Sequence, residues 1–138
     1  MRTQLLTSFL FLAVPALAAE LTCPASITVD ETLTSNHEGW TVGRTDLLRR
    51  LSGITIFEGN PADMASLIGE QRKPAKTMIV STWRFTPGAQ YWVSCSYSGT
   101  RIVLSQPIPQ SYRACIITYA TDVSIDGAPE IRKVEWHH

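Results

Sequence analysis

Hydrophobic and polar positions alternate with a period of two along most of the chain after residue 20. This spacing is typical of β-strands that bury one face. It predicts strands at 27–29, 51–57, 77–85, 91–97, 101–104, 115–120 and 131–136. The segment Ser98-Gly99-Thr100 is short enough to join two of them as a hairpin. We therefore expect six or seven strands.

One short helix is expected within this β pattern, from Asn60 to Gly69. Asn60 suits the N-cap, and Pro61 suits the first helical position because an N–H there has no partner within the helix. Asp63 would lie near the positive end of the helix dipole. The apolar face of this helix would consist of Met64, Leu67 and Ile68. Residues 45–51 are a weaker candidate for a further helical turn.

These elements predict a mostly β fold, as an antiparallel sheet, a sandwich or a half-open barrel with one short helix. No repeat, low-complexity tract or linker divides residues 19–138, so we expect one β-rich domain of ordinary size. Each tryptophan lies in or beside a predicted strand, and we expect all four to pack in the core or on a sheet face, with an exposed recognition surface as the alternative. They are Trp40, Trp83, Trp92 and Trp136.

Residues 1–18 have the pattern of a cleavable signal peptide. Arg2 supplies the positive start, an apolar run extends from Leu5 to Leu17, and Ala16-Leu17-Ala18 offers small residues for cleavage. The apolar run is about 13 residues, too short to cross a bilayer core of about 30 Å. We therefore expect residues 19–138 to be exported without a membrane anchor.

The charge of the chain is balanced. The sequence has 12 Lys and Arg against 12 Asp and Glu, and cleavage after residue 18 would remove Arg2, leaving a net charge near −1. Nucleic-acid and membrane-surface binders need clustered positive charge. The composition therefore argues against both classes of partner.

The three cysteines, Cys23, Cys95 and Cys115, all follow the predicted signal peptide. In an oxidising compartment two of the three are expected to form a disulfide, with three pairings possible. We favour Cys95 with Cys115, because both lie in strand-like runs that a sheet could place side by side. Cys23 would then be a buried free thiol, a partner for another cysteine or a reactive thiol.

Residues suited to catalysis or metal binding are few. His37 is isolated, His137 and His138 end the chain, and no Gly-x-Ser-x-Gly motif occurs. A pair of Cys23 with His37 is conceivable by residue type alone. Glycoside hydrolysis needs two carboxylates at a defined distance, and the sequence does not give the distances between the candidates. These candidates are Glu38, Glu58 and Glu70. We predict no enzyme activity, no catalytic residue, no cofactor and no metal site.

Short motifs follow one another along the chain in a recognisable order: Cys23-Pro24, Ile27, Gly39-Trp40, Ile54, Phe57, Gly59, Pro61, Trp83, Trp92-Val93-Ser94-Cys95-Ser96-Tyr97, Thr100, Leu104 and Cys115. This order resembles a family of small exported proteins of Gram-negative bacteria, some of them encoded beside type VI secretion effectors that attack peptidoglycan. The resemblance implies a periplasmic binding protein that acts as an inhibitor or immunity protein. The strand motif around Cys95 is also similar to that of lysozyme inhibitors.

An inhibitor of this kind needs an exposed loop on a rigid scaffold. The candidate loop is the hairpin connection made of Tyr97, Ser98, Gly99, Thr100 and Arg101. Tyr and Arg carry disproportionate binding energy at protein interfaces. Residues 84–90 are a second candidate. Two other functions stay open, an envelope-assembly component with an exposed sheet edge and an enzyme with convergent titratable groups. The oligomeric state is open as well.

Overall fold

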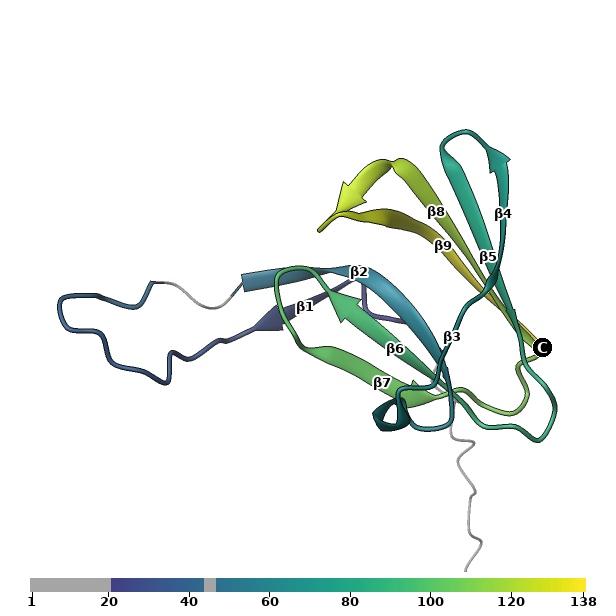
Figure 1. Cartoon of the computed structure of the whole chain (residues 1–138), viewed down its shortest axis with the longest axis horizontal. Coiled ribbons are helices and arrows are strands. Elements are labelled where there is room, and N and C mark those ends of the chain that lie inside the picture. The colour runs from purple at the N-terminus through teal and green to yellow at the C-terminus, as the bar shows by residue number, and fades with distance from the viewer. Residues whose placement is uncertain (1–20, 44–46) are drawn as a thin grey trace, which may run out of the picture.

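The computed structural model describes residues 21–43 and 47–138 (Figure 1). The predicted signal peptide, residues 1–18, lies outside the described residues. The described chain is mostly β, and its antiparallel strands form two sheets that curl into a half-barrel. The prediction of a mostly β, antiparallel and half-open fold is confirmed.

The first sheet has five strands and the second has four. The first follows the order β1-β2-β6-β7, with β3 paired to the far end of β2. Its strands are β1 (Ser26–Val29), β2 (Leu47–Glu58), β3 (Ser66–Leu67), β6 (Tyr91–Tyr97) and β7 (Val103–Pro107). The second follows the order β4-β5-β8-β9. Its strands are β4 (Glu70–Ala75), β5 (Met78–Arg84), β8 (Ala114–Ile125) and β9 (Ala128–His137).

The seven predicted strands are all present, and the sequence misses β3 and β4. Every residue of β4 is exposed, and its sequence is Glu-Gln-Arg-Lys-Pro-Ala. An edge strand of this kind is held by hydrogen bonds to its neighbour and buries no apolar face. It therefore lacks the alternation on which strand prediction depends.

The core lies between the two sheets. Ile56 of β2 and Ile117 of β8 are both 0% exposed and belong to one buried cluster. The other buried members are Leu21, Ile54, Trp83, Phe85, Tyr91, Val93, Ile108 and Cys115. Both sheets supply this cluster, so the predicted period of two points the apolar side chains of each sheet toward the other.

The predicted helix is a single 3-10 turn, η1 (Pro61–Asp63). The N-cap prediction is confirmed, because the backbone N–H of Ala62 donates to Asn60 Oδ1 at 2.9 Å. The continuation to Gly69 is wrong. Met64 has the left-handed φ of 58° that ends the turn, and Leu67 in β3 then pairs with β2. Of the expected apolar helix face, Leu67 is therefore part of a strand, and Met64 and Ile68 are exposed.

The prediction of a further helical turn at residues 45–51 is also wrong for residues 47–51, the part that the structure describes. β2 begins at Leu47, and residues 47–50 pair with β1. Thr45 and Asp46 lie outside the described residues. Pairing with a neighbouring strand overrides the local preference of this short segment. Among residues 21–43 and 47–138, no helix is long and apolar enough to cross a membrane.

The disulfide joins Cys23 to Cys95, with 5.8 Å between their Cα atoms. The predicted pairing of Cys95 with Cys115 is wrong, because β6 and β8 belong to different sheets and are not neighbours. Cys23 instead reaches β6 from the segment before β1, where Leu21 is buried in the core. Cys115 is a free thiol and is 0% exposed. The bridge therefore fastens the N-terminal segment to the middle of the first sheet.

Candidate protein-binding site

The connection from β1 to β2 leaves the two sheets as a long arm, which we define as residues 30–43 (Figure 1). Every residue of the arm is exposed, and none lies in a helix or strand. Its sequence contains three acidic residues and no Lys or Arg. The arm is therefore acidic in composition, with Asp30 and Glu31 at its base and Glu38 in its outer part.

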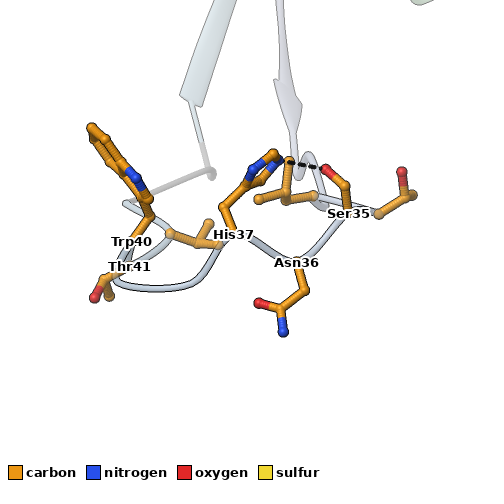
Figure 2. Close-up of a pocket in the computed structure, with 8 residues that line it drawn as sticks. Ser35, Asn36, His37, Trp40 and Thr41 are labelled. Carbon is orange, nitrogen blue, oxygen red and sulfur yellow. Dashed lines mark hydrogen bonds between the residues drawn. The ribbon is translucent and has the colours of Figure 1, made fainter.

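A tight turn within the arm places Trp40 in solvent. The backbone N–H of Trp40 donates to the carbonyl oxygen of His37 at 3.1 Å, and Gly39 between them has a φ of 81°. A type II turn needs this left-handed conformation, which glycine adopts without strain. On the other side of the turn, Ser35 Oγ and His37 Nε2 form a hydrogen bond of 2.9 Å (Figure 2).

Three large apolar side chains of the arm lie in solvent. Leu33, Trp40 and Val42 are 53%, 83% and 57% exposed. They help to line a hollow of about 680 Å³ whose walls come from the arm alone (Figure 2). The prediction that Trp40 packs in the core or on a sheet face is wrong, because the arm does not fold back onto either sheet. Clustered exposed apolar side chains of this kind mark interaction sites.

The connection from β6 to β7, which we call the tip (residues 98–102), is a braced hairpin loop. The backbone N–H of Ser98 donates to a carbonyl oxygen of β2 at 2.8 Å, and that of Gly99 donates to Asp126 Oδ2 at 2.7 Å. Gly99 has a φ of 64°, and a Cβ there would lie 2.6 Å from Arg49 Nη1. The left-handed φ favours glycine, and a larger residue would also displace the end of the Arg49 side chain. The hairpin expected at this position is confirmed by the pairing of β6 with β7.

The tip presents fewer side chains than the sequence suggested. Tyr97 is 3% exposed, and its buried hydroxyl has no hydrogen-bond partner among residues 21–43 and 47–138. Burial raises the pKa of this hydroxyl. Tyr97 therefore offers a partner little surface, whereas Arg101 and Ile102 are exposed.

The arm and the tip lie at the same end of the molecule. β2 runs antiparallel to β6 and pairs Leu51 with Tyr97, so β2 begins where β6 ends. An ion pair of 3.4 Å between Arg49 Nη2 and Glu31 Oε1 ties the base of the arm to β2. A hollow of about 590 Å³ opens between the base of the arm, the tip and Asp126. We call the arm, the tip and the β8–β9 turn the binding end.

The second candidate loop, residues 84–90, lies at the opposite end of β6. Its Phe85 is 7% exposed and belongs to the core, and the backbone N–H of Thr86 donates to the hydroxyl of Tyr91 at 3.2 Å. The antiparallel register therefore separates the two candidate loops by the length of β6. They do not form one surface.

The candidate catalytic groups are not brought together. His37 and Glu38 are exposed on the arm, while Glu58 is exposed at the far end of β2. Cys23 is held in the disulfide, and burial raises the pKa of the remaining thiol, Cys115, to about 12. In the described part of the chain, no three His, Cys, Asp or Glu residues are placed to share a metal ion.

Sequence reasoning missed the arm as a binding element, because Gly39-Trp40 looked like part of a strand region. One signal could have found it. Residues 30–43, which follow the predicted strand 27–29, have no regular period, yet they hold three large apolar residues among polar ones: Leu33, Trp40 and Val42. An aperiodic stretch with large apolar residues is typical of an exposed interaction loop.

Comparison with known proteins gives two findings. The family model for the type VI secretion system Tli immunity protein matches residues 44–134. An uncharacterised 16.3 kDa protein from the trpG 5′ region of Azospirillum brasilense is 32% identical over 133 residues, covering 88% of this chain and 87% of that protein. No solved structure matches. The family match begins where the arm ends, and it includes the tip.

Proposed function

Since the chain belongs to the family of type VI secretion system Tli immunity proteins, its role is to neutralise an effector protein, and we propose that it does so in the periplasm by contact alone. The family supports a protein partner and an inhibitory role. The arrangement of the described residues supports binding more than chemistry, because Leu33, Trp40, Val42 and Ile102 are exposed at the binding end and the titratable groups do not converge.

The disulfide and the leader pattern support a periplasmic location. A bridge between Cys23 and Cys95 persists in an oxidising space, whereas cytosolic thiols are kept reduced. Residues 1–18 have the sequence pattern of a signal peptide. We therefore take residues 19–138 as the mature protein, folded as one domain.

The observation that carries the binding proposal is the 83% exposure of Trp40 at the turn of an acidic arm. A tryptophan side chain offers about 200 Å² of surface, and burying most of it would contribute roughly 4 kcal/mol as an upper bound. Trp is enriched among the residues that dominate interface energies. The complementary surface on the effector would be an apolar pocket rimmed by basic residues.

The tip would form the second part of the interface through Arg101 and Ile102. It is braced by β2 and the β8–β9 turn, so little conformational freedom is lost when a partner binds. The family match covers the tip but begins after the arm, at residue 44. We therefore assign the arm to the recognition of one particular effector and the matched part to the shared scaffold.

The effector would act on the cell envelope, and the sequence resemblance makes peptidoglycan its expected substrate. The test uses the effector encoded next to this chain, incubated with purified peptidoglycan and, separately, with phospholipid vesicles. Release of soluble peptidoglycan fragments that stops when the immunity protein is added would support the cell-wall target. Release of fatty acids instead would contradict that target and leave the immunity role intact.

The binding site is tested with Trp40→Ala and a matched control. Met64 is 80% exposed but lies after η1, beyond the far end of β2, so Met64→Ala removes a similarly exposed apolar side chain outside the binding end. Calorimetric titration with the effector should show about 100-fold weaker binding for Trp40→Ala, which corresponds to about 2.7 kcal/mol, and unchanged binding for Met64→Ala. Equal affinities of both variants would exclude the arm as the main contact.

The location is tested in bacteria that are attacked by a strain carrying the effector. The full chain should protect them, and a version that begins at residue 19 and stays in the cytosol should not. Equal protection by both versions would contradict a periplasmic site of action.

A further inference from the structure

The outer edge of β7 is an open sheet edge. β7 is the last strand of the first sheet, and all five of its residues are exposed. Its sequence, Val-Leu-Ser-Gln-Pro, contains no charge. A terminal strand of this kind offers backbone N–H and C=O groups to another chain.

The other edges carry features that discourage such pairing. β4 contains Arg72, Lys73 and Pro74, and β9 carries charged side chains of both signs. β1 has only four residues and runs directly into Asp30 and Glu31. Charges, proline and shortness are the usual protections of an edge. By comparison, β7 is the least protected edge among the described strands.

The backbone direction of β7 follows from its hydrogen bonds. The N–H of Ile108 donates to the carbonyl oxygen of Tyr91 at 2.8 Å, so Ile108 points its backbone groups toward β6. Because these directions alternate along a strand, the N–H groups of Val103 and Ser105 point away from β6. The hydroxyls of Ser94 and Ser105, which face each other across the strands, are 2.6 Å apart, as expected for a pair without mutual backbone bonds.

We propose that an extended, uncharged segment of the effector adds to the first sheet as a strand along β7. It would exchange backbone hydrogen bonds with Val103 and Ser105. Apolar side chains of the segment would pack beside Ile102, Val103 and Leu104, which are 45%, 54% and 40% exposed. Strand addition to an open edge is a recurring mode of peptide recognition. This inference rests on the proposed function, since the occupant is the effector.

Two observations favour the effector over a second copy of this chain. β7 follows the tip directly in the sequence, so a segment paired with β7 would lie beside a surface that already belongs to the binding end. A five-residue edge is about 17 Å long. Pairing of two such edges alone would bury far less than the 1,200 Å² or so of a specific stable interface. The edge therefore suits an addition to a larger contact better than a dimer of its own.

The test compares Ser105→Pro with Ser105→Ala. Proline removes the outward N–H and places its ring where the added strand would lie, while the bonds to β6 come from neighbouring residues. Pro107 already occupies the same outward register in β7, so the strand tolerates proline there. Alanine loses the same bond to Ser94 but keeps the N–H, which makes it the matched control.

With the full-length mature protein and the neighbouring effector, Ser105→Pro should bind at least tenfold more weakly than Ser105→Ala. Hydrogen exchange should show the amides of Val103 and Ser105 exchanging fast in the free protein and protected in the complex. Equal affinities, or fast exchange in the complex, would overturn the strand addition and leave the immunity role standing. Failure of the unsubstituted protein to bind would overturn both.

A concentration-dependent dimer of the free protein that Ser105→Pro dissolves would also overturn the inference, because a second copy would then occupy the edge. Light scattering after size exclusion, run for the unsubstituted protein and both variants, measures this. A thermal unfolding curve of each variant shows whether it is folded, and the Val103→Lys variant provides the same binding test without a proline. Lysine at this exposed position should also weaken effector binding at least tenfold.

Discussion

Loss of the Cys23–Cys95 disulfide should be the most damaging single change to this scaffold outside its core. The two cysteines are 72 residues apart in sequence. A cross-link that closes a loop of this size lowers the conformational entropy of the unfolded chain. This stabilises the folded state by about 4 kcal/mol at room temperature. Domains of this size are stable by only about 5–15 kcal/mol in total. The bridge is therefore a large fraction of the stability available.

The assay is urea unfolding of the mature protein with and without dithiothreitol. Reduction should lower the midpoint by more than about 1 M, given the usual dependence of the unfolding free energy on urea. The double variant Cys23→Ser/Cys95→Ser should have the low midpoint in both conditions. Cys115→Ala is the matched control, because it removes a cysteine, keeps the bridge and should still respond to the reductant.

The pairing itself is read by tryptic mapping without reduction. Cleavage after Arg84 and Arg101 releases residues 85–101, which contain Cys95. This peptide should be joined to the one that ends at Arg44, while residues 114–132 carry the unmodified Cys115. A link between peptides 85–101 and 114–132 would refute the pairing. A urea midpoint that is the same with and without reductant would refute the estimated stabilisation by the disulfide.

Three further predictions concern packing and pH, and all are measured as free energies of unfolding in urea. Ile117→Ala should cost about 3 kcal/mol because the side chain is 0% exposed, whereas Ile68→Ala, at 94% exposure, should cost less than about 0.5 kcal/mol; similar losses would contradict the placement of the core. Gly69→Ala should cost about 1–3 kcal/mol because its Cβ would lie 2.7 Å from the ring of Trp83, and a neutral result would mean that the ring is free to move. Burial raises the pKa of Cys115 from 9.0 to about 12, so the folded state holds a proton that the unfolded state loses. The contribution of Cys115 to stability should therefore be constant below about pH 9 and fall by up to about 1.4 kcal/mol per pH unit between pH 9 and 12, so the loss of stability over this range should be smaller in Cys115→Ala.

Much of the scaffold follows from local rules. The strand predicted at 91–97 has the same bounds as β6, because alternate positions are buried and Pro87-Gly88 ends the preceding run. The N-cap at Asn60 was predictable from its own side chain and the proline after it. Such features depend on residues a few positions apart, which the sequence displays directly.

Part of the candidate site was predictable and part was not. The tip was predictable as a hairpin because Ser98-Gly99-Thr100 is a short turn sequence between two strands. The bracing of Gly99 was not, because it depends on Arg49 and Asp126, which approach from other parts of the chain. The exposure of Trp40 showed in the sequence only as the lack of a regular period in residues 30–43, because whether the arm folds back onto a sheet depends on contacts with distant residues.

Sequence by itself determined the β class, seven of the strands, the leader pattern and the resemblance to a secretion-associated family. These follow from period, turn chemistry and motif order, all of which are local. Tertiary structure decided which strands share a sheet, and therefore that Cys95 meets Cys23 while Cys115 stays free. It also decided that β2 begins beside the end of β6, which places the arm next to the tip. Contacts between residues far apart in sequence depend on how the sheets pair and pack, and no local pattern encodes that choice.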